Sequence, residues 1–437
     1  MSIQSGRKKY YLAILLVCLF GMIVGVLYID GKYGGGQIKA YVTQYVIDRK
    51  QESKDGKKEP IQEENNIDEP SQGADEAQQQ EQPSDKIRNS DMKQEFNLNS
   101  KTSFCTFDKE FLMSSKDGVK YFRGMKEQKW NDTFTMTNPF LIKEGNYAAV
   151  GDLGGRSVQV YNEEGLRYRI QTEGTLVFFS MNTNGYLAVI SKDAETYKVM
   201  IYKGDGSLLK GRVEETEGVY PLSVDISDDN KVFAISYLDS SDIEPIARVL
   251  FFYIEEKDGE NYTDSMFAAV EKENQVIPMV AFMEDGTLAA PSDREVYGIN
   301  QKGKEIWHKQ WSNYVDFIQI EKKYITVALG GVLPNQEGQK NGTVVWINSK
   351  GKETGNMEEK GEVSYLKSSG DYTVIGRGKK YFGTNESGKV LWEYSASEDI
   401  YDMLPLENTN VLYVTKSAAK IVDMKNYADK ISDKNKK

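Results

Sequence analysis

The sequence predicts an all-β fold, a β-propeller of about eight four-stranded blades, with seven blades as the alternative. Three observations support this prediction. A strand–turn–strand unit recurs about eight times between residues 100 and 425. Each unit continues into two more short strands joined by a glycine-bearing turn, and no long helical periodicity interrupts the series. Self-similarity at a nearly fixed period is the signature of a repeat architecture.

The first half of each unit is a hydrophobic run, a polar turn and a second hydrophobic run. Clear copies are PFLIKEGNYAAVGD (139–152), FFSMNTNGYLAVIS (178–191) and YLKSSGDYTVIG (365–376), and a degenerate first copy occupies 105–117. A β-sandwich and a β-solenoid are the alternatives. A sandwich would not need the same four-strand order eight times, and the coils of a solenoid usually have shorter periods.

The second half of each unit is a hairpin, as in VYGINQKGKEIWHKQW (296–311) and YFGTNESGKVLWEYS (381–395). Glycine adopts the positive φ angle of such turns without steric cost. One further turn is expected near residues 257–259, and the last unit, 398–424, supplies only three strands. We therefore expect a segment near 94–99 to close the ring as the missing outer strand. The turn glycines are Gly165, Gly206, Gly303, Gly351 and Gly388.

The segments that end G-K-x-(L/I)-W, at 303–307 and 388–392, resemble the repeats of pyrroloquinoline-quinone-type propellers. The turns at 227–230 and 284–286 resemble the S-P-D-G turns of WD40-like propellers. The chain as a whole resembles an uncharacterised group of membrane-anchored proteins from Gram-positive Clostridia, known as a domain of unknown function. The resemblance covers about residues 100–425 and implies an architecture rather than an activity.

Residues 10–29 form an uncharged and mostly apolar stretch, which at 20 residues is long enough to span the roughly 30 Å hydrocarbon core of a membrane as a helix. Arg7, Lys8 and Lys9 precede it, so the positive-inside rule places residues 1–9 in the cytoplasm and everything after Asp30 outside the cell. A cleaved signal peptide is the alternative, although no A-x-A-like site follows. We expect a single-pass anchor in the cell membrane.

Residues 30–95 are expected to form a juxtamembrane segment and a disordered acidic linker. Residues 51–95 contain 13 acidic and 6 basic residues and too few apolar ones to offset the entropy cost of folding. The propeller is expected to occupy 96–425, with a disordered charged tail at 426–437. Because the predicted propeller shows no basic stripe and is expected outside the cytoplasm, nucleic acid is excluded as a partner.

Few residues suit catalysis. Outside the predicted membrane span the chain has one cysteine, Cys105, and one histidine, His308, and none of the common hydrolase, metalloprotease or P-loop motifs occurs. Cys105 is expected to be buried and His308 to lie on the surface. The quinone-type propeller enzymes usually contain a pair of neighbouring cysteines, which this chain lacks, so no cofactor and no metal are predicted. Asp225, Asp316 and Asp402 are possible channel carboxylates for an envelope enzyme that acts on glycans or depends on a quinone or metal.

In a propeller, the loops between the second and third strands share one face with the connections between blades. Two of these loops, 238–248 and 330–342, are long, and functional residues concentrate in such loops. We therefore predict a binding or scaffold module that engages a protein or a cell-wall polymer through this face. The candidate binding residues are Asp152, Arg156, Asp239, Asp242, Arg248, Asp293, Arg294, Asn335 and Arg377.

Overall fold

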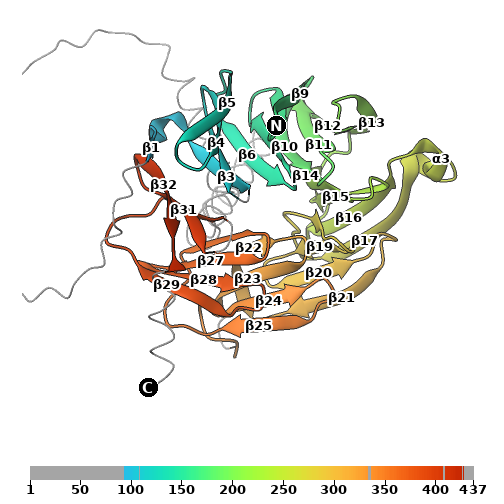
Figure 1. Ribbon diagram of the computed structural model, residues 1–437. Helices are drawn as coiled ribbons and strands as arrows, with labels where there is room; N and C mark the ends of the chain where they lie inside the picture. Colours follow the sequence, from blue (N-terminus) through green and yellow to red (C-terminus); the bar gives the residue numbers. More distant parts are fainter. Residues whose placement is uncertain (1–92, 108, 333–335, 407–408, 426, 428–437) are drawn as a thin grey trace, which may run out of the picture. The chain divides into compact units, whose positions relative to one another are not determined.

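The computed structural model describes residues 93–427 except 108, 333–335, 407–408 and 426. The predicted membrane helix at 10–29 lies outside these residues, as do the juxtamembrane segment and nearly all of the linker. Within the part of the chain that the structure describes, no helix is long and apolar enough to cross a membrane. The described residues form eight four-stranded antiparallel sheets, so the predicted propeller is confirmed with eight blades rather than seven (Figure 1).

The first four blades follow one another along the chain, each with its first strand innermost. Blade 1 contains β2 (Ser103–Phe107), β3 (Glu110–Ser115), β4 (Gly118–Arg123) and β5 (Glu127–Thr133). Blade 2 contains β6 (Pro139–Glu144), β7 (Tyr147–Asp152), β8 (Ser157–Asn162) and β9 (Gly165–Gln171). Blade 3 contains β10 (Thr175–Met181), β11 (Leu187–Asp193), β12 (Thr196–Tyr202) and β13 (Leu208–Glu214). Blade 4 contains β14 (Val219–Ile226), β15 (Val232–Asp239), β16 (Ile246–Tyr253) and β17 (Met266–Glu273).

The next three blades have the same order. Blade 5 contains β18 (Ala281–Phe282), β19 (Leu288–Pro291), β20 (Glu295–Ile299) and β21 (Glu305–Gln310). Blade 6 contains β22 (Asn313–Ile320), β23 (Tyr324–Val332), β24 (Val344–Asn348) and β25 (Glu353–Met357). Blade 7 contains β26 (Tyr365–Ser369), β27 (Tyr372–Arg377), β28 (Lys380–Asn385) and β29 (Val390–Ser395).

Blade 8 joins the two ends of the described chain. Its three inner strands are β30 (Asp402–Pro405), β31 (Asn410–Val414) and β32 (Ala418–Asp423), and its outer strand is β1 (Gln94–Glu95), which pairs antiparallel with β32. In Figure 1, β1 (blue) lies beside β32 (red). The backbone N–H of Phe96 also donates to the carbonyl of Ser417 at 3.0 Å. The predicted closure by a segment near 94–99 is confirmed.

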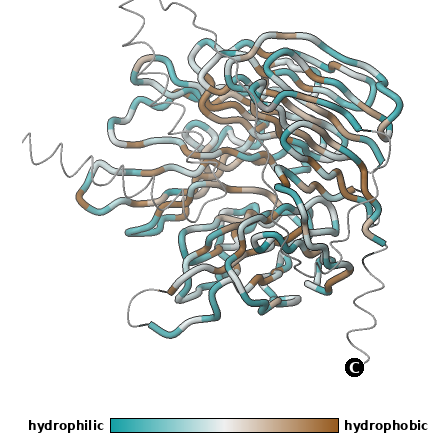
Figure 2. The backbone as a smooth tube through the Cα atoms, turned by 90° about the vertical axis from the view of Figure 1, so that its left-hand side faces the viewer, coloured by the Kyte–Doolittle hydropathy of each residue, from teal (hydrophilic) through white to brown (hydrophobic). Residues whose placement is uncertain are grey.

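The hydrophobic cores lie between consecutive blades. Successive side chains of a strand point to opposite faces of its sheet, and inner strands such as β7, β15 and β27 are buried at nearly every position, so both faces of each sheet are covered by neighbouring blades. One core cluster joins Phe104 and Phe111 of blade 1 to Leu404 and Leu412 of blade 8, and others join each pair of consecutive blades from blade 1 to blade 7 in the same way. The apolar stretches lie along the strands, and the turns are mostly hydrophilic (Figure 2). Each of these clusters among the described residues is shared by two blades, so we expect stability to depend on the complete ring.

The turns between third and fourth strands pack on the preceding blade. Gly351 of blade 6 has φ 74°, and a Cβ atom there would lie 2.6 Å from the ring of Trp307 of blade 5. The indole N–H of Trp307 donates to the carbonyl of Ser349 in the same turn at 2.7 Å. Trp130 of blade 1 makes the equivalent hydrogen bond to Glu163 of blade 2 at 2.9 Å. The tryptophan that ends the segment 303–307 is therefore a contact between blades, whereas the indole N–H of Trp392, which ends 388–392, donates to the hydroxyl of Tyr372 within blade 7.

The turn expected near 257–259 is longer than a hairpin turn. It contains the one-turn helix α3 (Glu256–Gly259) and the 3₁₀ helix η2 (Thr263–Ser265), and it projects from blade 4 (Figure 1). A second 3₁₀ helix, η1 (Leu98–Ser100), connects β1 to β2. Lys210 of blade 3 donates to the hydroxyl of Ser265 at 2.6 Å and fixes the projecting turn from its neighbour. The sequence pattern did not predict this insertion, because its polar residues resemble an ordinary turn.

Deletion of residues 90–100 is expected to lower the melting temperature of the propeller, on the order of 10 °C, because it removes β1 and the side chain of Phe96 from the core between blades 1 and 8. Deletion of 55–80 is the matched control and is expected to leave the melting temperature unchanged. Thermal unfolding followed by circular dichroism measures both. Equal melting temperatures for the two deletions would contradict closure by β1.

Candidate functional site

The propeller has two different faces. The loop face, as we name it, carries the loops between second and third strands together with the connections between blades. The turn face carries the turns between first and second strands and between third and fourth strands. All candidate binding residues predicted from the sequence that fall among the described residues lie on the loop face, in blades 2, 4, 5 and 7. Asn335, in the blade 6 loop, lies outside the described residues.

Several of these candidates bind their own loops. The carboxylate of Asp152 is buried and accepts a hydrogen bond from the backbone N–H of Asn138 at 2.7 Å. The guanidinium of Arg377 is buried and donates to the carbonyls of Gly342 and Gly361, which belong to a blade 6 loop and to the connection that follows blade 6. In these positions the two side chains hold loops together.

The remaining candidates of blades 2 and 5 are more accessible. Arg156 is exposed, while its backbone carbonyl accepts from the N–H of Thr172 at 2.7 Å. Asp293 is exposed and lies 3.4 Å from the guanidinium of Arg294. Asn313, which the sequence did not single out, anchors the long blade 6 loop by donating to the carbonyls of Gly330 and Gln339 at 2.7 and 2.9 Å.

Blade 4 brings three segments of the loop face together, 214–220, 239–246 and 273–281, which we call the blade 4 patch. The backbone N–H of Ser240 donates to the carbonyl of Gly218 at 2.8 Å. The backbone N–H of Asn274 donates to the carbonyl of Pro245 at 2.8 Å, and its side-chain amide donates to Glu244 at 3.0 Å. The three segments therefore form one continuous surface.

The blade 4 patch is acidic. Its segments contain no lysine, arginine or histidine and seven acidic residues, namely Glu214, Glu215, Glu217, Asp239, Asp242, Glu244 and Glu273. Asp239 is paired with Arg248 at 2.6 Å, and Glu214 is paired with Arg212. The other five are exposed and form no ion pair with another described residue. The predicted candidates Asp239 and Asp242 lie in this patch, and Arg248 borders it on β16.

Apolar side chains stand among these carboxylates. Ile243 is 96 % exposed, and Val276 and Tyr220 are each 40 % exposed. Tyr220 packs edge-on against Tyr197 of blade 3, with ring centroids 6.2 Å apart. Asp242 accepts from the N–H of Ile243 at 2.7 Å, and Asp239 accepts from the N–H and hydroxyl of Ser241 at 3.0 and 2.6 Å. Hydrogen bonds thus support the loop that presents Ile243 to solvent.

A second cluster of charges crosses the central channel at the turn face. The ammonium of Lys322 in blade 6 lies 3.3 Å from the carboxylate of Glu144 in blade 2 and 3.1 Å from that of Asp228 in blade 4. It also donates to the carbonyl of Phe282 in blade 5 at 3.2 Å. Glu321, next to Lys322, accepts from the N–H of Gly370 in blade 7 at 3.2 Å. Residues far apart in the sequence thus connect blades across the ring.

The three possible channel carboxylates do not form one constellation. Asp225 lies at the turn-face end of β14 beside the Lys322 cluster and accepts from the N–H of Phe282 at 2.7 Å. Asp402 is the first residue of β30, at the loop-face end, and accepts from the hydroxyl of Tyr365 at 2.5 Å. Asp316 lies within β22, where a Cβ atom on Gly330 would contact its carboxylate. Asp225 and Asp402 therefore lie at opposite ends of the inner strands.

The chain matches the Family of unknown function (DUF5711) over residues 84–424. It belongs to this family. No curated protein matches the chain. Solved structures with a similar fold include BamB from Moraxella catarrhalis, with 11 % identity, a TM-score of 0.46, and 76 % of this chain and 98 % of that chain covered. Hsv2p from Kluyveromyces lactis has 9 % identity, a TM-score of 0.41 and coverage of 68 % and 97 %.

BBS1N in complex with ARL6DN has 12 % identity, a TM-score of 0.40 and coverage of 66 % and 92 %. At these identities the solved structures assign no function to this member of the DUF5711 family. Functional inference therefore rests on the side chains of this chain.

Burial and hydrogen bonding shift the pKa values of carboxyl groups in the channel cluster and in the blade 4 patch. Burial raises the pKa of Asp225 to about 7, and the charge of Lys322 only partly opposes this. Burial, with the nearby charge of Glu144, raises the pKa of Glu321 to about 7. On the blade 4 patch, hydrogen bonds from Ser241 hold the pKa of Asp239 below its ordinary value. The channel cluster thus contains carboxyl groups that titrate near neutral pH, whereas the patch carboxylate stays ionised.

The one cysteine and the one histidine of the described residues lie as the sequence predicted, Cys105 buried and His308 on the surface. Cys105 is buried between blades 1 and 2, and burial raises the pKa of its thiol to about 12, so the reactive thiolate is suppressed. His308 is on the outer strand of blade 5, with a half-exposed side chain 3.3 Å from Glu305. Neither residue adjoins the blade 4 patch or the channel cluster.

The propeller is expected to lose stability as the pH rises from 5 to 8. Asp225 and Glu321 have ordinary pKa values of 3.8 and 4.5, which the fold raises to about 7. Their protonated forms stabilise the fold fully below the ordinary values, and this contribution is lost as the pH rises through 7. The double variant D225N/E321Q keeps one oxygen acceptor in each side chain but removes both titrating groups. It should reduce the loss of unfolding free energy between pH 5 and 8 by roughly 2–5 kcal/mol.

Urea unfolding at several pH values measures this effect. Glu256→Gln, at an exposed position on α3, is the matched control and is expected to keep the wild-type slope. If the double variant and the wild type show the same dependence of unfolding free energy on pH, the two carboxyls do not titrate in the folded state as expected.

Proposed function

We propose that the protein is a membrane-anchored, extracytoplasmic binding and scaffold module that engages a partner protein through the blade 4 patch. The observation that supports this most is the combination of exposed apolar side chains with exposed carboxylates on a hydrogen-bonded surface. Surface apolar groups with nearby polar rims are typical of protein interfaces. The propeller supplies the rigid support, and the loops supply the recognition surface.

The charge of the patch indicates the chemistry of the partner segment. Five exposed carboxylates without a basic neighbour in the three segments create a negative potential that attracts lysine and arginine side chains. Ile243 is the natural anchor, because its nearly complete exposure leaves apolar surface to bury on binding. We infer a basic segment that carries at least one apolar side chain. An anionic polymer of the cell envelope would be repelled by the same carboxylates.

Membrane anchoring is part of the proposal and rests on the sequence of residues 7–29. The basic residues Arg7, Lys8 and Lys9 stand before the apolar stretch 10–29, which favours a cytoplasmic N-terminus. A tethered scaffold outside the membrane would meet partners at the cell surface.

A photoreactive residue introduced at position 243 in living cells is expected to cross-link to one protein, whose contacting segment is rich in lysine or arginine. The same residue at position 306, a 48 % exposed site on the outer strand of blade 5, is the matched control. Charge reversal in E217K/D242K/E244K should abolish the cross-link while preserving the melting temperature. A cross-link to a polysaccharide, or equal cross-linking at 243 and 306, would contradict the proposal.

With the purified partner, the substitution I243S is expected to weaken binding about tenfold, corresponding to about 1.4 kcal/mol. Binding to the wild type should also weaken as salt is added, since screening reduces attraction between exposed charges. Isothermal titration calorimetry at two salt concentrations measures both effects. Unchanged affinity in I243S would exclude this side chain as the anchor.

Protease added to intact cells without a wall is expected to digest the propeller and to leave an N-terminal tag protected. Immunoblotting against tags at each end of the chain measures the outcome, and a cytoplasmic protein serves as the control for cell integrity. Protection of the propeller until the membrane is dissolved would contradict the extracytoplasmic location, whatever the result of the cross-linking.

A further inference from the structure

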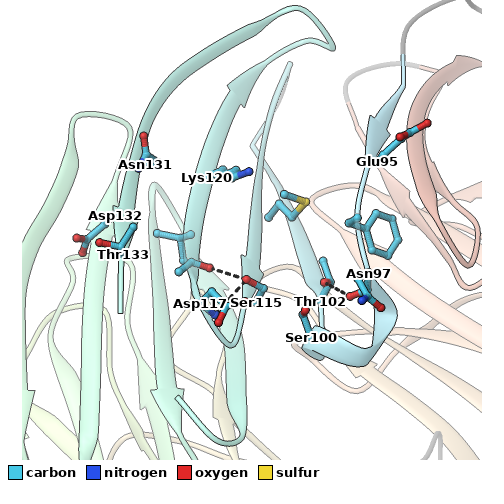
Figure 3. Close-up of a pocket in the computed structure, with 14 residues that line it drawn as sticks. Glu95, Asn97, Ser100, Thr102, Ser115, Asp117, Lys120, Asn131, Asp132 and Thr133 are labelled. Carbon is cyan, nitrogen blue, oxygen red and sulfur yellow. Dashed lines mark hydrogen bonds between the residues drawn. The ribbon is translucent and has the colours of Figure 1, made fainter. Parts of the chain in front are cut away.

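A pocket of about 230 Å³ lies at the junction where the ring closes. One wall is the connection from β1 to β2, and the other is the blade 1 loop between β3 and β4 together with the end of β5. In Figure 3, Asn97 and Thr102 lie on the first wall, and Lys120 and Asn131 lie on the second. The pocket is on the loop face, in a different blade from the blade 4 patch.

Backbone contacts hold the walls in place. The N–H of Lys116 donates to the carbonyl of Ser100 at 2.9 Å and joins the two walls. Gly118 is pressed against β5, since a Cβ atom there would lie 2.3 Å from the carbonyl oxygen of Asp132. Thr102 is buried, and its hydroxyl donates to the carbonyl of Asn97 at 3.0 Å. The pocket is therefore formed before any ligand arrives, which reduces the entropy cost of binding.

The charges around the pocket are largely balanced. Asp132 is paired with Arg169 at 2.7 Å, and Glu95 is paired with Lys93 at 2.9 Å. Asp117 and Lys120 remain, one acidic and one basic, and neither forms an ion pair with another described residue. A ligand with a net charge would be attracted by one of them and repelled by the other. The electrostatics favour a neutral ligand.

The polar groups of the lining both donate and accept hydrogen bonds. Lys120 and the amide of Asn131 offer N–H donors, Asp117 offers acceptors, and the hydroxyls of Ser100 and Thr133 can do either. Phe96, Met113 and Val119 add apolar surface. A hydroxyl group is itself both donor and acceptor, and the C–H groups of a polyol are apolar. The volume is below the roughly 300–1,000 Å³ of pockets for drug-sized molecules, so the ligand is small.

We propose that this pocket binds a neutral, polyhydroxylated small molecule or terminal unit, such as one sugar ring. The site is separate from the partner-binding surface. It would give the propeller a second ligand of a different chemical class on the same face.

The test uses the full-length chain in a detergent without a sugar headgroup, with glucose, N-acetylglucosamine and glycerol as neutral probes. Sodium glutamate and lysine hydrochloride are the charged comparisons. Saturation-transfer NMR detects contact, and titration gives the dissociation constants. We expect at least one neutral probe to bind more tightly than both charged ones. Asn131→Ala and Lys120→Ala should each weaken that binding about tenfold, corresponding to about 1.4 kcal/mol.

The matched control is Lys203→Ala, an exposed lysine on the turn face, which should bind the neutral probe as the wild type does. Ser100→Trp, designed to fill the pocket, should abolish binding. Its melting temperature shows whether the fold is retained, and the two alanine variants decide the result if it is not. Three outcomes overturn the proposal: no neutral probe binds, a charged probe binds more tightly, or binding is equal in wild type and in both alanine variants. None of them affects the cross-linking expected at position 243.

Discussion

Closure of the ring is the constraint on which the rest of this structure depends. Every described core cluster is shared by two consecutive blades, so a blade without its neighbour would expose an apolar sheet face. Blades 1 and 8 can become neighbours only if the two ends of the domain meet. The pairing of Gln94 and Glu95 with β32, together with Phe96 packed against Phe104, brings them together. Two strand residues and one aromatic ring thus complete a domain of more than 300 residues.

The two faces of the propeller differ in how their charged side chains are paired. At the turn face, Lys322 connects blades across the channel through Glu144 and Asp228, and the side chains there mostly satisfy one another. On the blade 4 patch, five exposed carboxylates form no ion pair with another described residue, and Ile243 is almost fully exposed. A binding surface requires exposed charged and apolar groups that are free to meet a partner, whereas a structural contact between blades requires charged groups that are already paired with each other. This contrast is why we assign binding to the loop face.

Much of the fold follows from local sequence. The repeated hairpins, the turn glycines such as Gly351 and the missing strand of the last unit each depend on a few neighbouring residues, so the blades and their closure could be predicted. The site could be predicted only in part. The loop with Asp239 and Asp242 was identified from its length, but its contact with segments 214–220 and 273–281 depends on sheet register. The absence of basic residues from all three segments was a usable signal. Glu144, Asp228 and Lys322 meet only across the closed ring, which no local pattern contains.

The contact between a turn glycine and the aromatic residue of the preceding blade has a direction along the chain. Trp307 supports the turn of Gly351, and Trp346 of that same blade lies against the turn of Gly388 in the next. Each blade therefore supports a turn of the next blade and has its own turn supported by the blade before it. The supporting residue changes along the ring, since Gly303 lies against Ala268 rather than a tryptophan. Because a glycine has no side chain to fit against its neighbour, the same backbone turn can recur at successive blade boundaries while the residue opposite it varies.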